Sequence, residues 1–167
     1  MKKIAIFGIH QQGLDIFLYL EKAGIKVDYL VTIDQELAIR NKAAGWIDYK
    51  KFAAQNKVKI FHCNSYSLSS EIDIDFFKKA ELDIVLLGGW QRLIPQNIIN
   101  KVKIAIIGQH GSSEMLPRGR GRSPISWSIL QNRKRIVWNL FRIVPGVDDG
   151  PILESETFDI NEWDDIE

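Results

Sequence analysis

Three short apolar segments each end at a glycine, and this repeat constrains the fold more than any other feature. The segments are residues 2–8 (KKIAIFG), 84–88 (IVLLG) and 103–108 (KIAIIG). Continuous apolar runs of this length are typical of strands buried on both faces of a parallel sheet. A glycine where such a strand stops allows a tight turn or a close approach of backbone to a ligand. The repeat therefore predicts an α/β protein.

Helical and extended segments alternate between these strands. Apolar residues in 14–23 recur as one face of a helix that stops at Gly24, and 26–33 reads as a second strand. Further along, we expect a helix end running into a strand over 52–61, a helix and a strand over 76–90, a helix over 123–132 with Pro124 in its first turn, and strands over 135–144 and 150–160. This order predicts a Rossmann-like, mostly parallel open sheet with helices on both faces and a final antiparallel strand pair.

The length of 167 residues suits one domain, so we expect a single domain over 1–167. The last residues, NEWDDIE, resemble the beginning of a helix, with Asn161 as its cap. Because the chain ends within that pattern, we expect a domain that is truncated at its C-terminus.

Composition excludes several classes of function. The net charge of +1 argues against a nucleic-acid partner, and no apolar run approaches the roughly 18 residues of a membrane span. Cys63 is the single cysteine, so we expect no internal disulfide, no thiol metal site and a cytoplasmic location. The three histidines are scattered and form no metal-ligand pattern. A homodimer is compatible with these properties.

Ligands bind beyond the carboxyl ends of strands in open α/β sheets, and three loops lie there. They are GIHQQG (8–13), GGWQRLIP (88–95) and GQHGSS (108–113). The first lacks the Gly-x-Gly-x-x-Gly spacing, so we reject nicotinamide binding. His10 could line a pocket, but we favour a surface histidine.

His110 is the sharpest candidate for chemistry, because an imidazole two residues beyond a buried strand can exchange protons near neutral pH. A structural histidine is the alternative. Asp148, in the turn between the last two strands, could orient that imidazole or accept an amine proton, whereas its plainer role is turn formation. Arg118, Arg120 and Arg122 alternate with glycines and suit a phosphate ligand, or else form a solvated basic loop.

Several ordered motifs resemble those of the N10-formyltetrahydrofolate-dependent formyltransferases. They are Gly89-Trp90, Leu93-Ile94-Pro95, His110-Gly111-Ser112, Leu116-Pro117, Gly121-Arg122-Ser123-Pro124 and Asp148-Asp149-Gly150-Pro151-Ile152. The resemblance covers the chain from its first strand to about residue 160 and implies a Rossmann-like fold with a final antiparallel pair.

The resemblance also implies roles for individual residues. His110 would stabilise the oxyanion that forms when an amine attacks the formyl carbon, and Asp148 would position His110 or a water and help to remove the amine proton. The co-substrate would be N10-formyltetrahydrofolate. Its contacts would come from Gly89, Trp90, Leu93, Ile94 and Val147.

The sequence departs from the family pattern at two places. The family asparagine that donates to the formyl oxygen falls at Gly108, and loss of one such donor typically costs about 10²–10³ in rate. The neighbouring Gln109 would point to the opposite face of a strand. The stretch from His110 to Leu116-Pro117 also carries two extra residues, so we expect a longer loop over the site.

The motif GRSPISW is similar to that of formyltransferases that act on amino sugars attached to nucleotides. We therefore expect transfer to the primary amine of a nucleotide-linked amino sugar, with Ser112, Arg118, Arg120 and Arg122 binding the substrate and Trp127 packed in the core. Two alternatives stay open: a non-catalytic folate- or nucleotide-binding relative, and an enzyme similar to methionyl-tRNA formyltransferase.

Overall fold

The computed structural model describes residues 2–165 and divides the chain into two compact units. The first unit is Met1–Ile106 and the second is Ile107–Glu167. The strand order is β3-β2-β1-β4-β5-β6-β7, and β5 (Ala105–Ser112) is the strand whose residues fall in both units.

Parallel strands form the sheet of the first unit. They are β1 (Ile4–Gly8), β2 (Tyr29–Thr32), β3 (Lys59–His62) and β4 (Ile84–Gly88). β1 lies between β2 and β4, with Ile6 opposite Leu30 on one side and Leu86 on the other. Because β1 has neighbours on both edges and helices on both faces, Ile6 and Phe7 are fully buried.

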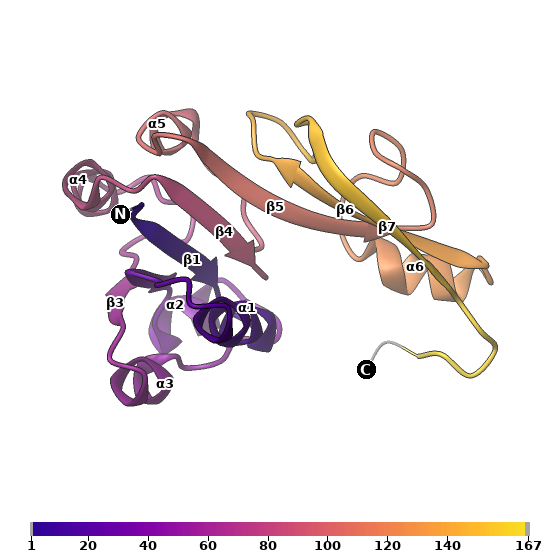
Figure 1. The fold of residues 1–167 in the computed structure, drawn as a ribbon, viewed down its shortest axis with the longest axis horizontal. Coiled ribbons are helices and arrows are strands. Elements are labelled where there is room, and N and C mark those ends of the chain that lie inside the picture. The colour runs from indigo at the N-terminus through magenta and orange to yellow at the C-terminus, as the bar shows by residue number, and fades with distance from the viewer. Residues whose placement is uncertain (1, 166–167) are drawn as a thin grey trace. The chain divides into compact units, whose positions relative to one another are not determined.

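Helices cover both faces of this sheet (Figure 1). Leu14 and Phe17 of α1 (Gln11–Lys22), with Ala53 of α3 (Lys50–Gln55), pack against Ile6 and Leu30. On the opposite face, α4 (Glu71–Ala80) brings the ring of Phe77 within 5.2 Å of the Phe7 ring. The short helices α2 (Gln35–Arg40) and α5 (Gln96–Ile99) complete this unit.

The second unit combines antiparallel strands with the helix α6 (Figure 1). β6 (Arg135–Arg142) pairs with β5 on one side and with β7 (Ile152–Asp159) on the other. The helix α6 (Pro124–Leu130) begins at a proline, as the sequence predicts. The predicted fold class, a mostly parallel Rossmann-like sheet with helices on both faces and a final antiparallel pair, is confirmed.

Three local expectations were wrong. β5 continues to Ser112, so His110 lies inside the strand and not beyond it, because β6 pairs with β5 as far as Ser112. Trp127 is 58% exposed, since the two-turn helix α6 fully buries only Ser128. At Asn161 the chain forms a turn, in which the Asn161 N–H donates to the Asp164 carboxylate at 2.8 Å, and no helix begins within 161–165. Residues 166–167 lie outside the described part.

Candidate active site

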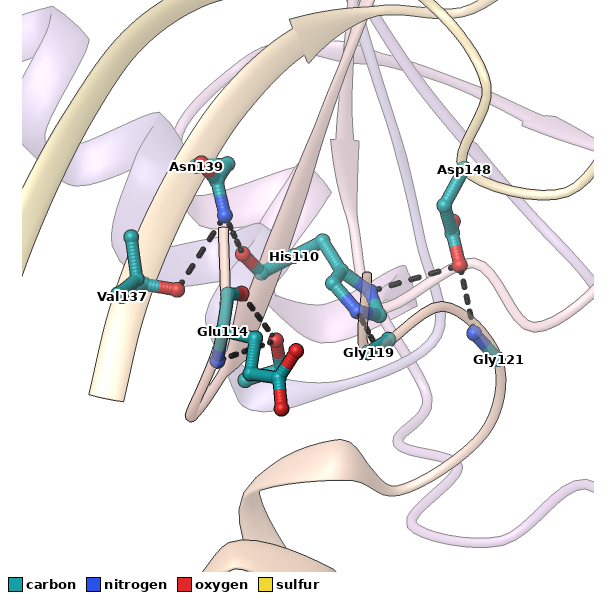
Figure 2. A network of polar contacts seen from close by, with 8 residues as sticks. His110, Glu114, Gly119, Gly121, Val137, Asn139 and Asp148 are labelled. Carbon is teal, nitrogen blue, oxygen red and sulfur yellow. Dashed lines mark hydrogen bonds and ion pairs between the residues drawn. The ribbon is translucent and has the colours of Figure 1, made fainter. Parts of the chain in front are cut away.

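His110 stands at the centre of a polar network in the second unit (Figure 2). Its side chain is 7% exposed, and both ring nitrogens face oxygen atoms. Nε2 lies 2.7 Å from the carbonyl oxygen of Gly119, and Nδ1 lies 3.5 Å from Oδ2 of Asp148. The structure therefore brings together the two residues that the sequence selects as catalytic.

Both oxygen atoms that face the ring act as hydrogen-bond acceptors. A backbone carbonyl can only accept a hydrogen bond, and an ionised carboxylate likewise has no proton to donate. An N–H group of the imidazole is therefore the donor in any hydrogen bond to them. An N–H donor held in this way is also the kind of group that stabilises a developing oxyanion.

Asp148 is held in a conformation that few residues adopt. Its φ of +48° lies in the left-handed region, which is uncommon for residues other than glycine and is frequent at functional sites. Its Oδ2 accepts the N–H of Gly121 at 3.0 Å as well as facing His110. The loop after β5 and the turn after β6 therefore meet at one carboxylate oxygen.

Asn139 holds the backbone of His110 from the neighbouring strand (Figure 2). The two residues are register partners, and Asn139 is 0% exposed. Its Nδ2 donates to the carbonyl oxygens of His110 and Val137, each at 3.3 Å, while its Oδ1 accepts from the Ser155 hydroxyl at 2.8 Å. Every polar atom of this buried amide is thus used, and the network links β5, β6 and β7.

Neighbouring side chains fill the space beside Gly108. Gly108 lies two residues before His110 in β5, so a side chain at this position would lie on the same face as the imidazole. A Cβ built at Gly108 would lie 2.7 Å from Cδ1 of Ile143 and 3.2 Å from the Phe141 ring. Two apolar side chains therefore occupy the region next to the missing amide.

The three predicted substrate arginines have different surroundings in the structure. Arg120 forms an ion pair with Asp149, in the turn that also contains Asp148. Arg118 lines a cavity together with residues 133–135. Arg122 is exposed. Their joint contact with a substrate stays a prediction.

Ser112 is buried, and its hydroxyl shapes the loop after β5. It donates to the carbonyl of Glu114 at 2.5 Å and accepts the Glu114 N–H at 3.3 Å. We interpret Ser112 as a residue that fixes the first turn of this loop. Its predicted contact with substrate stays a prediction.

In the first unit, the loops after β1 and β4 meet at His10. A Cβ built on Gly89, whose φ is +82°, would lie 2.4 Å from the His10 ring, so only a glycine fits there. Nε2 of His10 lies 2.8 Å from the Ala44 carbonyl and 2.9 Å from Nε2 of Gln91. His10 is therefore half-buried and partnered, unlike the surface histidine that the sequence predicts.

Tyr49 fixes the backbone beneath that histidine. Its hydroxyl donates to the carbonyl of His10, and the side chain is fully buried. Burial raises the pKa of the Tyr49 phenol far above its ordinary value, so this hydroxyl stays a donor at every physiological pH.

The predicted folate residues differ in exposure. The Trp90 ring packs against Phe7 and Tyr66, and its buried Nε1 has no hydrogen-bond partner among residues 2–165. Leu93 is exposed and Ile94 is buried, while Val147, in the second unit, is exposed. In the first unit, Leu93 is thus accessible and the indole N–H of Trp90 is unsatisfied.

A family model described as formyl transferase matches residues 2–167. The chain belongs to the formyl transferase family. It is 25% identical over 165 residues to a methionyl-tRNA formyltransferase of Prochlorococcus marinus, covering 99% of this chain and 48% of that protein. It is 26% identical to the bifunctional polymyxin resistance protein ArnA of Wigglesworthia glossinidia brevipalpis, covering 97% of this chain and 24% of that protein.

Solved structures support the same fold. The phosphoribosylglycinamide formyltransferase of Bacillus halodurans superposes with a TM-score of 0.74 at 22% identity, over 98% of this chain and 83% of that one. A formyltetrahydrofolate deformylase of Burkholderia mallei gives a TM-score of 0.72 at 16% identity, over 98% of this chain and 56% of that one. The chain spans about half the length, or less, of the curated relatives named above.

Other classes of site are not evident in the described part of this formyl transferase family member. Between residues 2 and 165 no three His, Cys, Asp or Glu side chains gather as metal ligands would. None of the helices described there has the length and apolar character that crossing a bilayer requires.

Sequence reasoning missed two parts of the network around His110. Asn139 lies between Val137 and Phe141 at strand spacing, and both neighbours are buried, so the alternation in β6 already indicates an inward-facing amide. The carbonyl of Gly119 carries no such signal, because backbone atoms are the same in every residue. Only the conformation of the loop places it against the imidazole.

Proposed function

We propose that this chain transfers a formyl group from N10-formyltetrahydrofolate to a primary amine. The observation that carries the proposal is the pairing of His110 with Asp148 at 3.5 Å, with both imidazole nitrogens facing oxygen atoms. Membership in the formyl transferase family supports the reaction type and the donor.

The chemistry assigns one task to each residue. The amine nitrogen bonds to the formyl carbon, and negative charge collects on the formyl oxygen as the tetrahedral intermediate forms. A ring N–H of His110 donates a hydrogen bond to that oxygen, which lowers the barrier. Asp148 accepts the amine proton, directly or through a water. The bond from carbon to N10 then breaks, and N10 takes up a proton as the folate leaves.

The folate is expected to bind through the loop after β4. Gly89, Trp90, Leu93 and Ile94 stay the predicted contacts there, and Val147 is the predicted contact in the second unit. The buried, unpartnered Nε1 of Trp90 supports a ligand at this loop, because an orphaned donor gains a hydrogen bond when an acceptor arrives.

For the acceptor, we propose the amine of a nucleotide-linked amino sugar. Two features support it: the GRSPISW motif, and the exposure of the Trp127 ring, which is thereby accessible to a ligand. Arg122 is exposed and available to a diphosphate. A cytoplasmic location and a homodimer complete the proposal as predictions.

A second candidate function is binding without catalysis. It is favoured by Gly108, since Ile143 and Phe141 fill the region where the family asparagine would donate to the formyl oxygen. A relative of this kind would bind a folate or a nucleotide and turn over neither.

The deciding experiment measures release of tetrahydrofolate with three acceptors: a nucleotide-linked amino sugar, glycinamide ribonucleotide and methionyl-tRNA. We expect turnover with the first, and loss of at least about 10²-fold in kcat on His110→Ala. The matched control is His62→Ala, which removes a half-buried histidine from β3 in the first unit. Turnover that survives His110→Ala overturns the mechanism. Binding of the donor without turnover of any acceptor establishes the second candidate function. Turnover confined to methionyl-tRNA means that the acceptor is this tRNA and not the amino sugar.

A further inference from the structure

The second unit contains a cavity in which Arg118 is the one lining residue that we also predict to contact the acceptor. It has a volume of about 700 Å³ and lies between the loop after β5, residues 113–118, and the segment 133–135 that leads into β6. Neither His110 nor Asp148 lines it. A volume of 300–1,000 Å³ is typical of pockets that take small-molecule ligands.

Positive charge dominates the walls of this cavity. Arg118 comes from one wall, and Arg133, Lys134 and Arg135 come from the other. Glu114 is the one carboxylate among the lining residues. The lining therefore carries a formal charge of +3, from four cations and one anion.

These cations form no ion pair within the described part of the chain. Nε of Arg133 donates to the side-chain oxygen of Gln131 at 3.1 Å, and Nζ of Lys134 donates to that of Asn132 at 3.1 Å. These neutral acceptors orient the side chains and leave their charge in place.

All four cationic residues are exposed, so an anion can reach them. Like charges gathered at one place create a positive potential that attracts anions. An anion in the cavity gains charge-assisted hydrogen bonds, and the forked guanidinium groups of arginine match phosphate oxygens in pairs. The apolar side chain of Leu116, which also lines the cavity, provides a surface for a non-polar part of a ligand.

We propose that this cavity is a binding site for a small ligand that carries two linked phosphate groups, of the nucleoside diphosphate class. The formal charge of such a ligand at neutral pH matches the charge of the lining, and its size matches the volume. A nucleic acid is disfavoured, because its backbone needs an extended track of cations and these four gather in one pocket. The site shares Arg118 with the predicted acceptor contacts, and binding there requires no formyl donor.

Calorimetric titration of the protein with uridine diphosphate and with inorganic pyrophosphate at 50 mM salt tests the site. We expect the triple variant Arg133→Gln/Lys134→Gln/Arg135→Gln to weaken uridine diphosphate binding by at least about 30-fold, because it removes three charge-assisted donors. Equal affinity for the two probes indicates a site that reads phosphate alone, and tighter uridine diphosphate binding indicates added nucleoside contacts. Either result supports the proposal.

The matched control is Lys22→Gln/Lys42→Gln/Lys51→Gln, which changes the net charge equally at exposed lysines of the first unit. It should bind uridine diphosphate within about twofold of the unaltered protein, and far-ultraviolet circular dichroism verifies that both triple variants fold. Arg118→Gln probes the opposite wall and should weaken binding with 133–135 intact.

Three results overturn the site. They are absence of binding of both probes at millimolar concentration, equal affinities of the two triple variants, and binding of an RNA hairpin that depends on 133–135 while uridine diphosphate does not bind. The outcome is separable from the proposed function. If no amine is formylated but the titration depends on 133–135, the reaction is wrong and the site stands. If formylation occurs and the titration does not depend on 133–135, the proposed reaction stands and the proposed binding site is wrong.

Discussion

Replacing Gly108 by asparagine tests whether catalysis at this site lacks the amide donor that the family has at this position. The substitution restores an amide on the same face of β5 as His110. Its Cβ would lie 2.7 Å from Cδ1 of Ile143, a contact so short that one atom must move. We therefore expect Gly108→Asn alone to be destabilised, and the double variant Gly108→Asn/Ile143→Val, which lacks that methyl group, to recover.

The magnitudes follow from the two contacts. Overpacking of this kind costs about 1–3 kcal/mol, partly offset by the roughly 1 kcal/mol that replacing a strand glycine returns. Ile143→Val alone costs about 0.5–1.5 kcal/mol. Ile143→Val removes the methyl group that the new side chain would contact. The free energy of unfolding of the double variant should therefore exceed the value expected from adding the two single effects by about 1 kcal/mol.

Urea unfolding of the four proteins gives the coupling energy, and a tetrahydrofolate-release assay gives the rate. If the asparagine donor is the missing part, the double variant should turn over about 10²-fold or more faster than the unaltered protein. Additive unfolding free energies would refute the contact between position 108 and Ile143. A stable double variant without any gain in rate would refute the role of the missing donor.

Three further predictions concern stability. Asn139→Ala should lower the free energy of unfolding by about 1–3 kcal/mol, because the buried carbonyl of His110 loses a donor; urea unfolding measures this, and a loss under 0.5 kcal/mol would contradict it. Tyr49→Phe should cost about 1 kcal/mol in the same assay, since the His10 carbonyl keeps one donor, the N–H of Gly13, and an unchanged midpoint argues against the hydroxyl contact. The pKa of His62 is lowered, first by burial and then by Lys50, so the unfolded chain binds a proton more readily and stability falls as pH drops below about 6.5. His62→Gln should therefore flatten the dependence of the unfolding midpoint between pH 7 and pH 5, and parallel curves for the two proteins would exclude this cause.

The parallel half of the fold could be predicted because its signals are local. Apolar runs that end at Gly8 and Gly88 correspond to β1 and β4, and both runs stop where the sheet stops. The end of β5 could not be predicted in this way. Residues 108–112 contain no apolar run, and pairing with β6, up to Ser112 opposite Val137, is what extends the strand.

At the candidate site, the sequence identifies residues but not their contacts. His110 and Asp148 are separated by 38 positions, and their approach depends on a left-handed turn that residue type does not dictate. For Trp127, the residue type itself led to a wrong prediction. Its aromatic ring suggests a core position, yet α6 is too short to bury more than one narrow side, and the ring is left outside.

The hydrogen bond between Nε2 of His110 and the Gly119 carbonyl competes with a hydrogen bond from the same nitrogen to the substrate. In the proposed reaction the formyl oxygen must replace that carbonyl, so only molecules in which the bond is broken can react. The apparent affinity for the reacting complex then equals the intrinsic affinity scaled by that fraction. Gly119 has a φ of +68°, and a Cβ there would lie 2.4 Å from the Ser112 hydroxyl, so a larger residue must shift the loop. Residue 119 therefore affects how often this hydrogen bond is broken. A loop that holds the bond more firmly stabilises the fold, whereas a loop that holds it less firmly leaves the imidazole of His110 free to contact the formyl oxygen.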